Sequence, residues 1–88
     1  MIDVDNIKTT LRDIFLEAIG FDPFMNDVDY HKSIGYRFAL DKWDIIELVV
    51  RMEIEFNITI TYSQDEDVKI MMMNIDELVD YVTSKLQK

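Results

Sequence analysis

Apolar side chains recur at helical spacing in three stretches of this 88-residue sequence. In residues 4–19, 41–56 and 74–86, an apolar residue returns every three or four positions, and polar residues fill the gaps. A helix with that period carries one apolar stripe, which it can bury against a neighbouring element. The pattern therefore predicts three amphipathic helices. Asn74 followed by Glu77 is typical of a capping box at the start of the last one.

The connections between these helices differ in character. Residues 21–40 contain a proline and a glycine but also many apolar side chains, which predicts a long loop packed on the core. Residues 58–62 alternate and are rich in branched side chains, which favours an extended connector, because no second strand of equal quality is present to pair with it. Residues 63–67 are predicted as a solvated turn, and residues 68–73 as a short third helix whose methionines fill the core.

These elements predict an all-α protein. One domain over residues 1–88 would form a small four-helix bundle, with three longer helices, a short third helix and a long first loop. A chain of this length buries roughly 60–65% of its extended surface, which is enough for a single core.

Composition narrows the function classes. The chain has 18 acidic and nine basic residues, for a net charge of −9. Such a field repels nucleic-acid phosphate and anionic lipid, and it favours basic protein partners. Without cysteine there is no disulfide, thiolate nucleophile or cysteine metal site. The acidic N-terminus predicts no signal peptide, and no apolar run approaches the ~20 residues of a membrane span, so we expect a cytoplasmic protein.

Residues that could carry catalysis or bind a metal are sparse. The one histidine, His31, has no evident nucleophile or second ligand beside it in the sequence. The acidic residues 65–67 lack the pattern of a calcium-binding loop. We therefore expect neither an enzyme nor a metal protein.

The helix predicted over residues 41–56 is apolar on two faces. One face is the predicted core face and consists of Ile45, Leu48, Val49, Met52 and Phe56. The second stripe consists of Trp43, Ile46, Val50 and Ile54. A helix in a small bundle seldom buries two stripes, so either the 21–40 loop covers the second stripe or a partner does. Trp43, at the start of the helix, is predicted to be a partly exposed contact residue.

The sequence from Asp41 onward, DKWDIIELVVRMEIEFNITI, resembles the second helix of the acyl carrier proteins and peptidyl carrier domains. In that family the helix opens with Asp-Ser-Leu, continues with Glu-Leu, and is followed by Phe and an Ile-rich segment. Asp41 matches the Asp, Trp43 the Leu, and Glu47 with Leu48 the Glu-Leu pair. Ala39 stands where the family has Gly.

Three further segments extend the resemblance over nearly the whole chain. IGF at 19–21 looks like the end of the family's first helix, SIGYRFA at 33–39 like the approach to the second, and NIDELVDYV at 74–82 like the last. The resemblance implies a helical bundle of the acyl-carrier type.

Lys42 is the departure that matters for chemistry. It stands where the family has the serine that carries phosphopantetheine, and lysine has no hydroxyl for attack on coenzyme A. We therefore expect no cofactor. The resemblance then implies a domain that docks on the basic surface of acyl-transferring or synthase enzymes (fatty acid, polyketide or related). The partner-binding residues implied by this surface are Asp41, Trp43, Asp44, Ile46, Glu47, Val50, Glu53 and Ile54.

Two alternatives stay open. The chain could be an active carrier whose arm sits on an unusual residue, such as Ser33 or Ser63. It could also be a small acidic inhibitor or immunity-type protein that uses the bundle only for its shape and binds a basic enzyme unrelated to acyl transfer.

Overall fold

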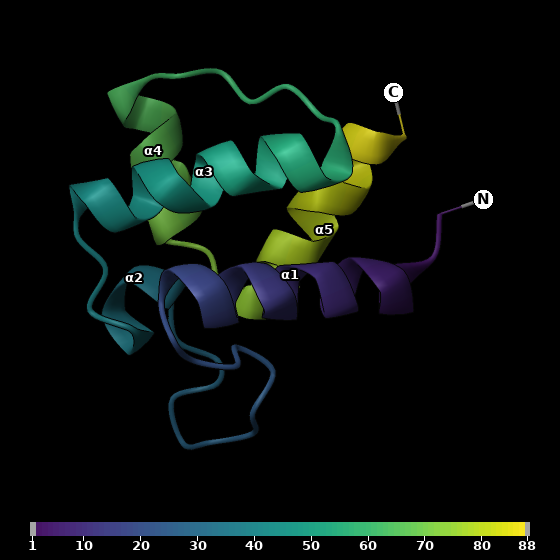
Figure 1. Ribbon diagram of the computed structural model, residues 1–88. Coiled ribbons are helices and arrows are strands. Elements are labelled where there is room, and N and C mark those ends of the chain that lie inside the picture. The colour runs from purple at the N-terminus through teal and green to yellow at the C-terminus, as the bar shows by residue number, and fades with distance from the viewer. Residues whose placement is uncertain (1, 88) are drawn as a thin grey trace.

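In the computed structural model, which describes residues 2–87, all regular structure is helical. The longer helices are α1 (Val4–Ala18), α3 (Lys42–Phe56) and α5 (Ile75–Leu86), and the shorter ones are α2 (Ile34–Arg37) and α4 (Gln64–Met71). The all-α prediction is confirmed, and the three longer helices lie where the apolar period places them (Figure 1). Because α2 was not predicted, the described part of the chain has five helices rather than four.

Side-chain caps begin the longer helices. Asp3 accepts hydrogen bonds from the backbone amides of Asp5 and Asn6 at the start of α1. Asn74 and Glu77 form the predicted capping box, in which each side chain accepts from the other's amide at 2.8 and 2.9 Å. These bonds satisfy amides that have no partner inside the helix, so they fix where each helix starts.

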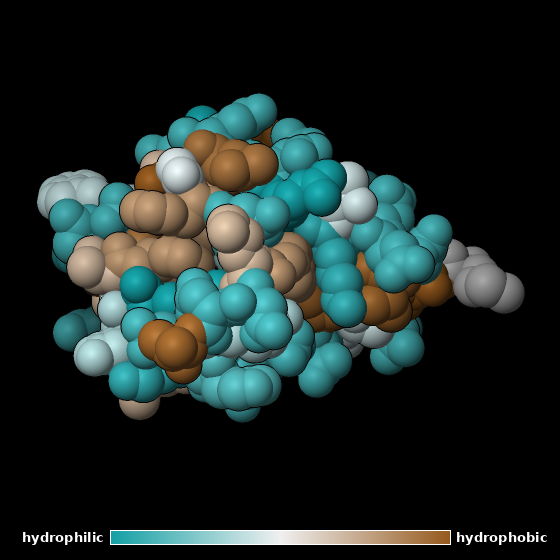
Figure 2. All heavy atoms as spheres, turned by 90° about the horizontal axis from the view of Figure 1, so that it is seen from below, coloured by the Kyte–Doolittle hydropathy of each residue, from teal (hydrophilic) through white to brown (hydrophobic). Residues whose placement is uncertain are grey.

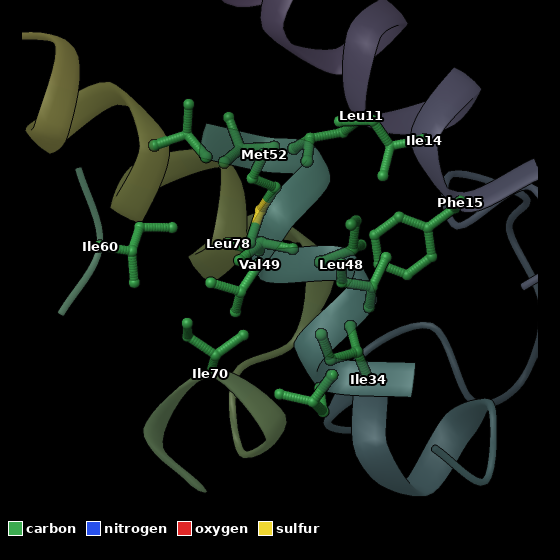
Figure 3. Packing of buried hydrophobic residues seen from close by; sticks show 14 of the residues in the cluster. Leu11, Ile14, Phe15, Ile34, Leu48, Val49, Met52, Ile60, Ile70 and Leu78 are labelled. Atoms are coloured by element: carbon green, nitrogen blue, oxygen red, sulfur yellow. The ribbon is translucent and has the colours of Figure 1, made fainter. Parts of the chain in front are cut away.

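The core forms where α1 packs against α3 and α5, and where α4 closes on α3. Figure 3 shows side chains from α1, α3, α4 and the segment before α4 pointing toward one interior. On α3, four of the five predicted core residues are buried and Phe56 is partly buried. The fully buried side chains are all apolar: Phe15, Leu11, Ile34, Ile45, Leu48, Met52, Ile60, Ile70, Ile75, Leu78, Val49 and Val82.

The connector after α3 forms no strand in the structure of residues 2–87, as predicted. It runs along α3 from the end of that helix back toward its start (Figure 1). Ile60 anchors it in the core, and the Ile60 amide donates to the Glu53 carboxylate at 2.9 Å. The prediction of a solvated turn at 63–67 is wrong, because α4 begins at Gln64. Acidic residues in a first helical turn are favoured by the helix dipole.

Arg37 of α2 holds the loop that precedes it. Its guanidinium donates to the carbonyl oxygens of Pro23 at 2.6 Å and Met25 at 2.7 Å, and it pairs with Asp27 at 3.3 Å. The side chain is 2% exposed and also lies over the Tyr30 ring, 5.1 Å from its centroid. One buried cation therefore organises much of a segment that has no regular structure.

The prediction of a loop packed on the core is only partly right. Residues 34–37 are helical, and Phe24 and Tyr30 pack against the core as expected. In contrast, Phe21, Met25 and Val28 are exposed, Val28 by 96%. Figure 2 views the molecule from the side of this loop and shows apolar atoms gathered on the left half of that face, with hydrophilic atoms around them.

α2 lies close against α4 because Gly35 has no side chain. A Cβ atom at Gly35 would lie 3.0 Å from the Met71 carbonyl oxygen, closer than ordinary van der Waals contact. The Ile34 amide donates to the Met73 carbonyl at 2.7 Å and joins the same two segments. This contact sets α4 in place beside α3.

Within residues 2–87, no helix combines the length and the apolarity that a bilayer crossing requires.

Candidate functional site

The entry of α3 is defined by two aspartates. The Asp41 carboxylate accepts from the Asp44 amide at 2.9 Å, and the Asp44 carboxylate accepts from the Asp41 amide at 3.0 Å. Both carboxylates also lie at the positive end of the helix dipole. Asp41 and Asp44, predicted as partner-binding residues, are thus first of all the capping box of α3.

Lys42 is the first residue of α3 and is exposed. A cation in a first helical turn costs about 0.3–1 kcal/mol through the helix dipole. Among the described residues, no carboxylate forms an ion pair with its ammonium group, which lies 6.0 Å from the centroid of the Trp43 ring. The lysine therefore presents a positive charge to solvent at the position that the resemblance assigns to the modified serine.

Ala39, two residues before this entry, has a positive φ of 52°. Left-handed backbone is unfavourable for residues with a Cβ atom and is readily adopted by glycine. The turn therefore has the conformation that a glycine would prefer, and glycine is the residue that the carrier family has at this position of the alignment.

The second stripe of α3 is largely uncovered. Trp43 is 73% exposed and Ile54 70%, while Val50 is just over one-third exposed and Ile46 is half-buried. The 21–40 loop therefore does not cover this stripe. Large apolar side chains at this exposure lose the stabilisation that burial would give, so the stripe is a candidate contact surface.

The acidic residues of α3 differ in how they are engaged. Glu47 pairs with Arg51 at 3.2 Å, and Arg51 also pairs with Glu17 of α1 at 2.8 Å. Glu53, which the resemblance places among the partner-binding residues, accepts instead from the Ile60 amide and the Tyr62 hydroxyl. Those two bonds occupy both oxygens of Glu53, so it supports the connector.

The hydrogen bond to Glu53 affects the phenol of Tyr62. That bond, with smaller contributions from desolvation and from the carboxylate charge, raises the pKa of Tyr62 above its ordinary value. The phenol of Tyr62 therefore stays a hydrogen-bond donor to higher pH than a free tyrosine would, and it holds the connector against α3.

A groove lies between the first half of α3 and α4, next to the exposed stripe. Its volume is about 580 Å³. Most of its surface is apolar, and its lining residues are Lys42, Ile45, Ile46, Tyr62, Ser63, Gln64, Asp67, Val68 and Met71. The sequence pattern did not predict this groove, because Met71 and its neighbours were interpreted as core residues. Met71 is half-buried, lines the groove and packs against the core, as Met73 also does, whereas Met72 is 70% exposed.

The two candidate attachment serines both cap helices. The Ser33 hydroxyl oxygen accepts from the Tyr36 amide, and the Ser63 hydroxyl oxygen accepts from the Glu66 amide. Ser63 is the more exposed of the two and lines the groove, whereas Ser33 is partly buried.

The one histidine of the chain does not line the groove. His31 is exposed and packs edge-on against the Tyr30 ring. No group of three or more potential metal ligands lies together within residues 2–87. In a comparison of the sequence with models of known protein families, none matched. The assembled features are thus a cation, an exposed apolar stripe and a groove, a set suited to binding.

Proposed function

We propose that this protein is a carrier-like helical domain without a prosthetic group, which acts by docking on carrier-handling enzymes through α3. The observation that carries the proposal is the position of Lys42. It is the first residue of α3, follows the capping residue Asp41 and is freely exposed. A residue at this place is accessible to a modifying enzyme, yet the lysine cannot form the phosphodiester that a serine would.

The turn before α3 also supports the proposal. Ala39 has the backbone conformation that favours the family's glycine, and Asp41 caps the helix three residues ahead of Asp44. The left-handed backbone at Ala39 and the cap at Asp41 are conformational features of one turn, so they support the alignment in addition to the match of residue types. The all-α bundle is compatible with the carrier fold, and we propose this fold together with the function.

The surface around Lys42 favours a basic partner. Exposed Trp43 and Ile54 offer apolar contact, and Asp44 and Glu47 lie on the same helix with negative charge. Against a net charge of −9, a partner with a basic surface would be attracted at long range and would then bury the apolar stripe. Acyl-transferring and synthase enzymes that bind acidic carriers are the partner class that fits.

Incubation with coenzyme A and a broad-specificity phosphopantetheinyl transferase, followed by intact-mass measurement, tests the missing attachment. The natural chain is expected to gain no mass, and Lys42→Ser is expected to gain one phosphopantetheine. An adduct on the natural chain would overturn the loss of the prosthetic group. A Lys42→Ser protein that folds normally and stays unmodified would contradict the alignment of position 42.

Docking is tested separately with purified carrier-handling enzymes on a biosensor. Trp43→Ser combined with Ile54→Ser is expected to weaken binding by at least about tenfold, because apolar hot spots dominate interfaces. The control is Val4→Ser, which truncates an exposed apolar residue on α1. Equal binding by the double variant and the control, or no binding of the natural chain to any of these enzymes, would contradict the proposal.

Ser63 supports a second candidate function, that of an active carrier with an unusual attachment residue. It is exposed and lines the same groove as Lys42. An adduct on the natural chain that disappears in Ser63→Ala would establish this function. An adduct that persists in Ser63→Ala would exclude this residue.

A further inference from the structure

The groove between α3 and α4 has apolar walls from both helices. Ile45 and Ile46 line it on α3, and Val68 and Met71 line it on α4. Val68 is half exposed and Ile46 is partly exposed, so this part of the groove wall is open to solvent, whereas Ile45 is fully buried behind it. The walls can therefore accept apolar side chains without displacing a core residue.

The residues that line the groove include one anion and one cation, and further carboxylates lie beside the groove at the starts of α3 and α4. Asp67 is among its lining residues, and Asp65 lies in the same first turn of α4. Asp41 and Asp44 lie at the start of α3, and Lys42 is the one cation among the lining residues. Because more carboxylates than cations lie at this end of α3 and α4, in a chain of net charge −9, the surroundings of the groove favour a ligand that combines apolar side chains with several positive charges.

From these features we infer that the groove receives the apolar side chains of a cationic amphipathic segment presented by a protein partner. The inference rests on the proposed docking function and adds α4 to the surface. The partner segment would place its apolar face between α3 and α4 and its basic side chains toward Asp65 and Asp67. The exposed Trp43, one residue from Lys42 at the groove, would then lie at the edge of the interface.

A synthetic peptide can test the groove without a known partner. The probe is an amphipathic peptide of about 14 residues, built only of leucine and lysine, with leucine at helical spacing. An isolated helix of this length is only marginally stable, but the peptide can become helical on binding. Trp43 is the only tryptophan of the chain and reports binding through its fluorescence. The comparison peptides are a leucine–glutamate twin and a scramble of the leucine–lysine sequence, and dodecanoate serves as an anionic amphiphile.

Val68→Gln and Met72→Gln form a matched pair of variants. Both residues are exposed apolar residues at or near α4, but only Val68 lines the groove. We expect the leucine–lysine peptide to bind the natural chain, and raised salt to weaken that binding because the attraction is partly electrostatic. Val68→Gln is expected to weaken binding by at least about tenfold, and Met72→Gln by less than about twofold. Shifts of the Ile45 and Val68 amide signals would locate the peptide.

Three results of the peptide experiment would overturn the inference. They are equal effects of the two variants, equal or tighter binding of the glutamate twin, and dodecanoate binding that excludes the peptide and depends on Lys42. The enzyme-docking measurement separates the two proposals. If Trp43→Ser with Ile54→Ser abolishes enzyme docking while Val68→Gln leaves it intact, the groove inference fails and the docking function stands.

Discussion

The Tyr81 hydroxyl on α5 donates a hydrogen bond to the Glu66 carboxylate in the first turn of α4. Burial, then this bond, then the charge of Glu66 raise the pKa of Tyr81 above its ordinary value of 10.0. The phenol is therefore held in its neutral form in the folded protein. The bond joins α4, the shorter of the two helices that form the groove, to α5.

The raised pKa of Tyr81 predicts a loss of stability at alkaline pH. Because the folded pKa lies above the unfolded value near 10, the stabilisation is complete below about pH 10 and declines as pH rises toward the folded pKa. Urea unfolding between pH 8 and about pH 11.5 should show this decline. Tyr81→Phe should lose about 1 kcal/mol at neutral pH and show a smaller decline.

Tyr36→Phe is the control for that experiment, because Tyr36 is exposed. Some alkaline decline should remain in Tyr81→Phe. Burial and then Asp76 raise the pKa of Tyr30, and the Glu53 bond raises that of Tyr62. An alkaline profile unchanged by Tyr81→Phe would show that the Glu66 bond does not stabilise the fold.

Arg37 gives a prediction about the order of the loop before α2. Arg37→Met should lower the free energy of unfolding by about 2 kcal/mol, because the change removes charge-assisted bonds to the carbonyl groups of Pro23 and Met25, the first of which is partly buried. The amides of residues 22–32 should exchange faster with deuterium. Lys32→Met, which removes an exposed cation from the same loop, should change stability by less than about 0.5 kcal/mol. Unchanged exchange in Arg37→Met would mean that the loop is ordered by its own turns.

Ala39→Gly should stabilise the protein. The left-handed conformation costs a residue with a Cβ atom about 1–2 kcal/mol, and glycine avoids that cost while losing more chain entropy on folding. The expected net gain is about 0.5–1 kcal/mol, read as a higher unfolding midpoint in urea. Ala18→Gly, at the last residue of α1, should instead lose up to about 1 kcal/mol. A destabilised Ala39→Gly variant would show that the methyl group makes a contact worth more than the strain.

Local sequence signals were sufficient for three helices and for the position of the second stripe on α3, although they left open whether the 21–40 loop covers that stripe. α1, α3 and α5 each have enough residues to repeat the apolar period several times, and helical geometry alone places Trp43 and Ile54 away from the core face. The extended connector also followed from local preference. These features depend on residues that are close to one another in the sequence.

α2 could not be predicted in this way, because four residues are too few to show a period. Long-range contacts stabilise it, including the Ile34 amide on Met73, and Gly35 close to Met71. For α4, a local signal was present but was outweighed by the run of acids. Ser63 followed by Glu66 is a start signal for a helix, and Ser63 does cap α4.

The site was predicted only as far as α3 alone determines it. The groove depends on how α4 docks against α3, which residues distant in sequence decide. The engagement of Glu53 is likewise non-local, because Ile60 and Tyr62 reach it only when the connector folds back along α3. The sequence pattern therefore assigned the Glu53 carboxylate to a partner, although the chain's own connector binds it.

The exposed stripe gives the last prediction, which separates folding from docking. Trp43→Ser and Ile54→Ser should each change the free energy of unfolding by less than about 0.5 kcal/mol, because both side chains are mostly in water. Leu48→Ala, between these two residues in the sequence but on the core face, should lose about 3 kcal/mol through the cavity it creates. Urea unfolding of the three variants measures the difference. A loss above about 1.5 kcal/mol for Ile54→Ser would mean that the stripe is part of the fold. If the variants are instead about as stable as the natural chain, the exposed tryptophan and isoleucine do not serve folding, and contact with another molecule is the reason for their presence on one helix.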